Sequence, residues 1–256
     1  MIAKVDLQHH LKCKEGDVGR YVLLPGDPGR VEMIASRLDR FWPVAQNREY
    51  VTYSGLLDNE LVSITSTGIG GPSAAIAVEE LSRLGADTFI RVGTAGGLQP
   101  FVEPGDLVVA QAAVRDEGTS RWYLPIEFPA VASYDVVEAL AQACTAQGNR
   151  HHVGVVHSKD SFYGQREPER MPVAQFLTER WAAWTAGGAL VSEMECASIF
   201  TVSAYLHRRR GAIVKVMSNK LLAIPRPDSI DNLIELSVDA LRRLIARDRV
   251  EAEKTR

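Results

Sequence analysis

The sequence predicts an α/β protein, in which helices cover both faces of a central mixed, largely parallel sheet and so form a three-layer α/β/α arrangement. Strand-like runs alternate with segments of helical period along the chain, as in a sheet covered by helices on both sides. Several of these runs end in glycine-rich turns that lead into a helix. Neither a linker nor an internal repeat interrupts the pattern, so we expect residues 1–256 to form a single domain.

The predicted strands are short runs of apolar and β-branched residues, and the helices between them have apolar residues at helical spacing. In chain order, strands are expected at Tyr21–Leu24, Tyr50–Leu57, Leu61–Ser66, Thr88–Val92, Asp106–Val114, Val153–His157 and Ala212–Met217. Helices are expected at Arg30–Leu38, Ser73–Leu84, Tyr134–Gln147, Met171–Thr185, Met194–Arg208 and Ile230–Arg247. The last helix is amphipathic, because its leucines, isoleucine and valine share one face.

Four turns after predicted strands are candidate ligand sites, because ligands of such sheets bind at the carboxyl ends of the strands. Glycine lets main-chain N–H groups approach a ligand closely, and a helix that starts next adds partial positive charge, so these turns suit anions. The four turns are Pro25–Arg30, Thr67–Ser73, Gly93–Gly97 and Ser158–Arg166.

The composition argues against several classes of protein. With 29 basic and 32 acidic side chains the formal net charge is −3, which gives no electrostatic footprint for nucleic acid or for an anionic membrane. The longest apolar stretch, near Leu107–Val114, is far shorter than the ~20 residues of a membrane span, and we find no signal peptide. Cys13, Cys144 and Cys196 show no CxxC spacing, so we expect neither zinc nor disulfides, and a cytoplasmic location.

The glycine loop at Gly68–Ser73 is close to the GxGxxG pattern of dinucleotide-binding folds. Such a fold would next need an acidic residue at the end of the following strand, where this chain has Arg91, and a serine replaces the third glycine. A lone glycine loop is a weak signal, so this interpretation is disfavoured. The motifs GxSxG, GxxxxGK[ST] and HExxH are absent from the sequence.

Arginines and carboxylates near the turns allow two interpretations each. Arg30, Arg48 and Arg91 are each consistent with a surface residue or an ion-pair partner, but beside glycine turns they could converge on phosphate, whose oxygens match the guanidinium fork. Glu193 and Glu195 could be ordinary acidic residues of a helix start. Alternatively, one of the two carboxylates faces a cleft and accepts hydrogen bonds from the vicinal hydroxyls of a sugar.

Eight segments together resemble the nucleoside phosphorylase superfamily, and within it the uridine phosphorylases. They occur in the family's order and span most of the chain, which makes the resemblance highly specific. The segments are PGDPGRVE at Pro25–Glu32, REY at Arg48–Tyr50, STGIGGPSAAIAVEEL at Ser66–Leu81, RVGTAGG at Arg91–Gly97, GDLVVAQAAVRDEGTS at Gly105–Ser120, EFPA at Glu127–Ala130, DSFYGQ at Asp160–Gln165 and SEMEC at Ser192–Cys196.

The resemblance implies reversible phosphorolysis of uridine to uracil and ribose 1-phosphate, with inorganic phosphate as co-substrate and no organic cofactor. It assigns residues to three parts of one site. The phosphate residues are Gly26, Arg30, Arg48, Arg91 and Thr94. The ribose residues are Glu193, Met194 and Glu195, with His10, next to His9, reaching the 5′-hydroxyl from a neighbouring subunit. The uracil residues are Ala95, Gly96, Phe162 and Gln165, with Arg166 beside them.

The resemblance also implies partners. We expect a homo-oligomer, a trimer of dimers, acting on a small-molecule nucleoside and phosphate, without nucleic acid or membrane. Members of the family bind a monovalent cation such as K⁺ at a dimer interface, and Glu49, Ile69 and Ser73 match those positions.

Two departures from the family pattern bear on the base. The uracil motif often carries an arginine two residues after the glutamine, but here Arg166 follows Gln165 directly, so whether Arg166 or Arg170 contacts the base stays open. Related purine phosphorylases have an aspartate after the serine of the late strand, where it protonates the purine. Here Asn219 takes that place, and an amide cannot act as a general acid.

Three alternatives are therefore less favoured than uridine phosphorolysis. A purine nucleoside phosphorylase keeps the phosphate and ribose sites but lacks its acid here. A nucleosidase that uses water would not need three arginines facing phosphate. A nucleoside-binding protein without activity would be expected to lose Arg30, Arg91 or Glu195, and the sequence has all three.

Overall fold

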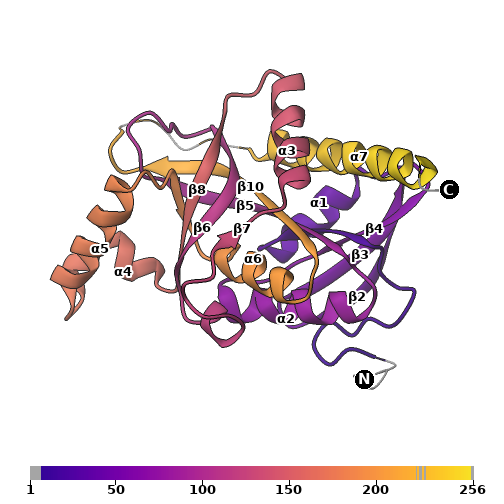
Figure 1. The fold of residues 1–256 in the computed structure, drawn as a ribbon, viewed down its shortest axis with the longest axis horizontal. Coiled ribbons are helices and arrows are strands. Elements are labelled where there is room, and N and C mark those ends of the chain that lie inside the picture. The colour runs from indigo at the N-terminus through magenta and orange to yellow at the C-terminus, as the bar shows by residue number, and fades with distance from the viewer. Residues whose placement is uncertain (1–6, 223, 225–226, 228, 255–256) are drawn as a thin grey trace.

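The computed structural model describes residues 7–222, 224, 227 and 229–254, and it confirms the α/β class (Figure 1). The described elements are, in chain order, β1 Tyr21–Pro25, α1 Val31–Ala35, β2 Arg40–Asn47, β3 Tyr50–Leu57, β4 Glu60–Thr65, α2 Gly71–Arg83, β5 Thr88–Gly97, β6 Leu107–Asp116, β7 Ala130–Val131, α3 Tyr134–Ala146, β8 His151–Lys159, α4 Phe162–Arg166, α5 Ala174–Ala186, β9 Val191–Glu193, α6 Cys196–Tyr205, β10 Arg209–Asn219 and α7 Asp231–Lys254. Short 3-10 turns occur at Pro28–Arg30, Ser120–Trp122 and Pro168–Arg170. Within the described residues, no helix is long and apolar enough to cross a membrane.

The strands form one mixed sheet in the order β10-β6-β8-β9-β5-β1-β4-β3-β2, with β7 paired to β6. The pairs β1–β4, β1–β5, β5–β10, β6–β8 and β8–β9 are parallel, whereas β2–β3–β4, β5–β9, β6–β7 and β6–β10 are antiparallel. Because β10 pairs with both β5 and β6, and β9 joins β8 to β5, five strands close into a ring. This ring brings the ends of strands from both halves of the chain around one opening.

Side chains alternate along the strands and divide the core between the two faces of the sheet. In β1, Tyr21 and Leu23 pack against one face together with α1, α3 and α7. Val22 and Leu24 pack against the other face, together with α2 and α6. Figure 1 shows α3 and α7 on one side of the strands and α2 and α6 on the other, which is the predicted three-layer arrangement. Helices α4 and α5 project from one end, and α5 has no buried residue.

The turn expected at Gly93–Gly97 is instead the second half of β5, which extends to Gly97 because β10 pairs with it along its whole length. A Cβ on Gly93 would lie 2.9 Å from the guanidinium of Arg91, and a Cβ on Gly97 would lie 2.8 Å from Nδ2 of Asn219. Glycine is therefore needed here for close packing inside a strand. This corrects the interpretation of these glycines as a ligand-binding turn.

Sequence patterns missed the short and the exposed elements. Strand β2 is mostly exposed and has a proline within its apolar run, which argues against a strand, and β7 and β9 are only two and three residues long, too short to give a pattern. The segment Ser158–Arg166, expected as a turn, continues β8 to Lys159 and then forms α4, whose first turn is capped by Ser161 accepting from the Gly164 N–H at 2.9 Å. Tertiary pairing, not local period, defines these elements.

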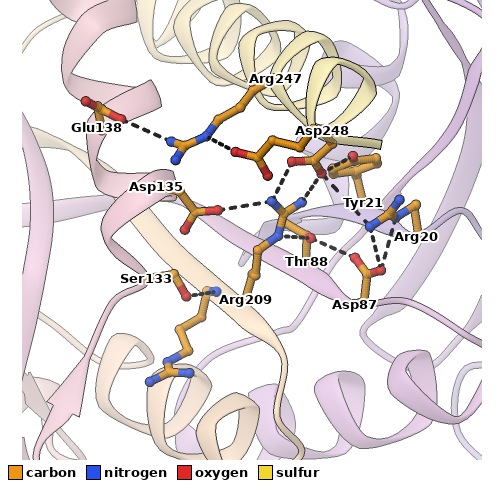
Figure 2. A network of polar contacts seen from close by, with 12 residues as sticks. Arg20, Tyr21, Asp87, Thr88, Ser133, Asp135, Glu138, Arg209, Arg247 and Asp248 are labelled. Carbon is orange, nitrogen blue, oxygen red and sulfur yellow. Dashed lines mark hydrogen bonds and ion pairs between the residues drawn. The ribbon is translucent and has the colours of Figure 1, made fainter. Parts of the chain in front are cut away.

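At the amino ends of β1, β5 and β10 a polar cluster ties α7 and α3 to the sheet (Figure 2). The guanidinium of Arg209 donates to Thr88 Oγ1 at 3.0 Å, to Asp135 Oδ2 at 3.0 Å and to Asp248 Oδ1 at 2.9 Å. Tyr21 also donates its hydroxyl to Asp248. We call these five residues the Arg209 cluster. It lies at the opposite end of the strands from the pocket described next.

Candidate active site

The carboxyl ends of β1, β5, β8, β9 and β10 surround a pocket of about 810 Å³. All of the residues predicted for the site line it except two, His10 and Arg48. The predicted residues along the lining are Gly26, Arg30, Glu49, Ile69, Ser73, Arg91, Thr94, Ala95, Gly96, Phe162, Gln165, Arg166, Glu193, Met194 and Glu195. The pairing of the strands explains this: β10 runs parallel to β5 along its whole length, and the short antiparallel pairing of β9 with Gly96 and Gly97 places Glu193 and the end of β8 beside the carboxyl end of β5.

Arg91 is the centre of the pocket's polar floor. Its Nε donates to Glu193 Oε2 at 3.0 Å and its Nη2 pairs with Glu195 Oε2. Burial on its own lowers the pKa of Arg91, but the two carboxylates outweigh burial and raise it, so the guanidinium is charged. Its Nη1 is buried and has no partner among the described groups, and it lies 3.7 Å from where a Cβ on Gly26 would stand. A charged donor left without an acceptor at a glycine-lined gap is what an anion site requires.

Glu193 holds Arg91 in place. Its carboxylate accepts from Ser158 Oγ and from the main-chain N–H groups of Glu195 at 2.8 Å and Cys196 at 3.0 Å, besides the arginine. Burial on its own would raise the pKa of Glu193, but Arg91 and these hydrogen bonds lower it. Because both oxygens already hold donors, Glu193 acts on a ligand through Arg91, and the direct ribose contact predicted for it is not what this arrangement favours.

Glu195 is the carboxylate with remaining capacity toward the pocket. One oxygen accepts from the Gly70 N–H at 2.6 Å and the other pairs with Arg91. Burial and the charge of Glu193 raise its pKa, against the opposing effect of Arg91. A carboxylate oxygen has two lone pairs, so Glu195 can still accept hydrogen bonds from two adjacent hydroxyl groups.

The end of the pocket near Arg30 is formed by the turn after β1 and the loop before α2. Asp27 accepts from the Gly29 N–H at 2.9 Å and shapes the 3-10 turn that presents Arg30, whose side chain is about one-fifth exposed. Gly68 has φ +68, and a Cβ there would lie 2.7 Å from Glu49 Cγ and 2.8 Å from Ser73 Oγ, so only glycine lets the loop close over the pocket.

The end of the pocket near Gln165, predicted to bind the base, is bounded by α4, α5 and the sheet. Gln165 accepts from Ser192 Oγ at 2.9 Å through Oε1, while its Nε2 is buried and has no partner in the described structure. A Cβ on Gly96 would meet only Ser218, at 3.9 Å, so the absence of a side chain there leaves space beside the amide. The guanidinium of Arg166 lies over the ring of Phe162, 5.8 Å from its centroid, at the rim.

Sequence reasoning missed four residues of the base end. Lys159, Trp181, Ser192 and Lys220 also line the pocket. Lys159 is 8 % exposed, and its Nζ donates to Ser192 Oγ at 2.8 Å. A lysine placed just before the DSFYGQ segment was the available signal, but nothing in the sequence shows that this side chain turns inward.

His10 and Arg48 lie together outside this chain's own pocket. His10 Nδ1 is 2.7 Å from Glu80 Oε1, and the His10 carbonyl accepts from Asn47 Nδ2 at 2.6 Å. Arg48 follows Asn47 at the exposed turn between β2 and β3, with φ 55. Arg48 therefore does not line the pocket of its own chain, and its assignment to phosphate stays a prediction.

Asn219 does not face the base. Its Nδ2 donates to the carbonyls of Gln99 at 2.8 Å and Val102 at 2.7 Å, and its Oδ1 accepts from the Leu221 N–H at 2.9 Å. These bonds tie the loop after β5 to the end of β10. The residue at this position is structural here, so its identity does not decide between pyrimidine and purine bases.

Comparison with known proteins agrees with this geometry. The model of the Phosphorylase superfamily matches residues 20–247. The chain belongs to this superfamily. It is 46% identical to a uridine phosphorylase of Treponema pallidum over 97% of this chain and 98% of that protein. It is 42% identical to a guanosine phosphorylase of Halorubrum lacusprofundi, over 93% and 95%, and 38% identical to a uridine phosphorylase of Escherichia coli, over 92% and 97%. Relatives of comparable identity therefore include both pyrimidine and purine nucleoside phosphorylases.

Proposed function

We propose that this phosphorylase cleaves uridine reversibly with inorganic phosphate, giving uracil and ribose 1-phosphate. One observation carries the proposal. A single pocket has an unpartnered cationic donor, Arg91 Nη1, at one end and an unpartnered amide donor, Gln165 Nε2, at the other. The Glu195 carboxylate lines the same pocket and pairs with Arg91. An anion, a sugar and a polar base would satisfy Arg91, Glu195 and Gln165 respectively, and the uridine phosphorylases among the relatives support the choice of base.

The chemistry follows from charge. Breaking the C1′–N1 bond builds cationic character on the ribose, as in glycoside hydrolysis. Phosphate held by Arg91 and Arg30 beside Gly26 attacks C1′ from the face opposite the base, and its negative charge stabilises the ribose cation. Glu195 fixes the ribose hydroxyls. The base leaves with the electron pair of the broken bond, and Gln165 donates to the oxygen on which that charge gathers.

We also propose that the active form is a homo-oligomer, a trimer of dimers, in which His10 and Arg48 complete a neighbouring subunit's pocket. Two observations support this: neither residue lines this chain's pocket, and Asn47, next to Arg48, donates to the His10 carbonyl at 2.6 Å, which places the two segments side by side. The pocket of the neighbouring subunit would be incomplete without these two side chains. We further propose that the protein acts in the cytoplasm, as its three buried free cysteines suggest.

A monovalent cation such as K⁺ fits the rim of the pocket by the chemistry of its donors. The Ser73 hydroxyl donates to Glu49 Oε1 at 3.0 Å, so these two oxygen atoms are close enough to bind the same cation. The Ile69 side chain is 77 % exposed and has no ligand atom, so this residue would contribute its carbonyl. Oxygen ligands suit a hard cation. Such an ion would order the loop that carries Gly68 and Gly70.

An assay of base release with uridine, thymidine, inosine, guanosine and adenosine, with and without phosphate, tests the proposed function. We expect phosphate-dependent cleavage of uridine above the purine nucleosides. Preference for guanosine or inosine would move the protein to the purine phosphorylases, as the Halorubrum relative allows. Cleavage without phosphate would indicate a nucleosidase, and binding without cleavage a nucleoside-binding protein.

A further inference from the structure

The base end of the pocket contains a buried cation that the proposed reaction has not yet used. Lys159, the last residue of β8, is 8 % exposed and lines the pocket, although lysine is almost never buried without a partner. Its ammonium donates to Ser192 Oγ at 2.8 Å and lies 3.5 Å from the Glu193 carbonyl. Burial lowers the pKa of Lys159 to about 8, while Glu193 and Glu195 oppose this effect.

Hydrogen-bond chemistry links this ammonium to the amide of Gln165. An ammonium can only donate, so Ser192 Oγ must accept from Lys159. The serine proton is then free to point away from Lys159, and Ser192 donates it to Gln165 Oε1 at 2.9 Å. His157 Nδ1 lies 3.1 Å from the same serine oxygen and donates to it in the tautomer that carries the proton on Nδ1. With Oε1 held in this way, the N–H groups of Gln165 Nε2 face the pocket, where the structure gives them no partner.

Charge gives Lys159 a second effect on the site. Arg91, Glu193 and Glu195 together carry one excess negative charge when all three are ionised, and all three are buried. A base that leaves as an anion would be repelled by that excess. The Lys159 ammonium cancels it at the base end, and because this ammonium is itself buried its charge has a large effect.

We propose that Lys159 is the positioning and specificity-determining residue for the departing base. Through Ser192 it holds Gln165 so that the amide N–H meets a carbonyl oxygen of the base, and its charge stabilises the base as the C1′–N1 electron pair leaves with it. The phosphate oxygen forms the new bond to C1′, and the proton that phosphate loses ends on the base through solvent. This inference rests on the proposed phosphorolysis, and it predicts selection of bases that carry a carbonyl over bases that carry an amino group at that edge.

Three variants separate the two effects of Lys159. Lys159→Met removes both the charge and the donor to Ser192. Lys159→Gln removes the charge but keeps a donor. Ser192→Ala keeps the charge and removes the link to Gln165. Each is assayed for kcat/KM on uridine and on 5-fluorouridine, whose electron-withdrawing fluorine makes the base a better leaving group and so less dependent on stabilisation.

We expect Lys159→Met to lower kcat/KM by about 100-fold on uridine but by no more than about 10-fold on 5-fluorouridine. Lys159→Gln should show the same change in the ratio between the two substrates. Ser192→Ala should lower both activities by about 10-fold and change the ratio by less than the Lys159 variants do, because the ammonium charge is kept. Lys220→Met is the matched control: it removes a lysine charge from the pocket rim, where the ammonium donates to the Arg166 carbonyl, and should leave the ratio unchanged.

Equal losses on uridine and 5-fluorouridine in both Lys159 variants would overturn the proposal, since a merely structural lysine would affect both substrates alike. If Lys159→Met does not fold, as thermal unfolding would show, Lys159→Gln decides alone. The proposed function fails separately, if the wild-type protein releases no uracil in a phosphate-dependent way. Cytidine provides a second readout, because its cleavage relative to uridine should rise in Lys159→Met.

Discussion

The two ends of the same strands hold two arginine–carboxylate clusters that differ in one respect. At the amino ends, Arg209 distributes its donors over Thr88, Asp135 and Asp248, and Figure 2 shows the cluster as a connected network. At the carboxyl ends, Arg91 is equally well paired through Nε and Nη2 but keeps Nη1 buried without an acceptor. A satisfied network stabilises the fold, whereas an unsatisfied donor in a pocket marks the place of a ligand.

The largest effect on activity should follow from Arg91→Lys. Lysine keeps the charge that Glu193 and Glu195 require but cannot supply the fork that includes Nη1. We expect kcat/KM for phosphate to fall by about 1,000-fold, or about 4 kcal/mol, with the fold retained. Initial rates at varied phosphate measure this, and circular dichroism monitors the fold. If the variant keeps the wild-type rate at low phosphate concentration, Arg91 Nη1 does not bind phosphate.

Asn219→Asp sharpens the comparison at a residue whose donors are satisfied. A carboxylate there would face the carbonyls of Gln99 and Val102, which now accept at 2.8 and 2.7 Å, and would repel both. We expect a loss of about 3 kcal/mol in the free energy of unfolding, measured by urea denaturation, and no gain of adenosine cleavage. Adenosine activity that rises in a stable variant would show that this position faces the base after all.

Arg209→Met tests the satisfied cluster itself. Asp248 and Asp135 would lose their common partner, and we expect the free energy of unfolding to fall by about 2 kcal/mol. The kcat/KM of the folded protein should stay within about twofold of the wild type, because the cluster lies at the far end of the strands. Denaturation and kinetics on the same preparation provide both values. A large loss of activity without loss of stability would contradict the division between the two ends.

Gln165→Ala tests the second unpartnered donor. Removing the amide leaves a carbonyl of the base without its donor in a buried place, and we expect a loss of about tenfold in kcat/KM for uridine, or about 1.4 kcal/mol. Stability should hardly change, because among the described residues the amide makes a single hydrogen bond, to Ser192. Unchanged kinetics with uridine would mean that the base lies elsewhere in the pocket.

The smallest expected effect is a pH dependence. Lys159 has a pKa of about 8, so its ammonium is present below that value and is lost as the pH rises through it. We expect kcat/KM for uridine to fall by about tenfold from pH 7 to pH 9 in the wild type, and to fall less in Lys159→Met. Uridine itself ionises in alkali, so the difference between the two proteins is the measured quantity.

Other charged or titratable groups surround Lys159. His157 contacts Ser192 and pairs with Asp116, which also pairs with Arg180 of α5. The remaining groups line the pocket: Arg91, Glu193, Glu195, Arg166 and Lys220. Identical profiles for the two proteins would assign the fall to another group.

The fold class could be predicted from local sequence patterns, and most of the pocket from the resemblance to the family. Apolar runs predicted seven strands, and glycine and arginine at their ends predicted the phosphate end of the pocket, including Arg30 and Arg91. Features that depend on distant pairing could not be predicted in this way. The glycines of Gly93–Gly97 look like a turn until β10 is placed beside them, and Asn219 looks like a base contact until Gln99 and Val102 are seen to accept from it.

The same limit explains Lys159 and His10. A lysine at the end of a strand is ordinarily exposed, and only the packing of α4 and β9 around β8 encloses Lys159. For His10 the resemblance to the family, rather than any pattern within the chain, indicated that it belongs to a neighbour's site. The structure agrees only in that His10 and Arg48 lie outside this chain's pocket.

The pairing of β5 with β10 also has a consequence for how the chain reaches its native state. Residues 88–97 and 209–219 are more than 100 positions apart in the sequence, so the pocket is built where an early segment of the chain pairs with a late one. Contacts of such long sequence separation form slowly, because closing the intervening loop costs conformational entropy. During synthesis, strands β1 to β5 can assemble while the pocket is still open on one side. Phosphate and nucleoside can therefore stabilise the protein only after β10 has been made, and a chain interrupted before it should bind neither.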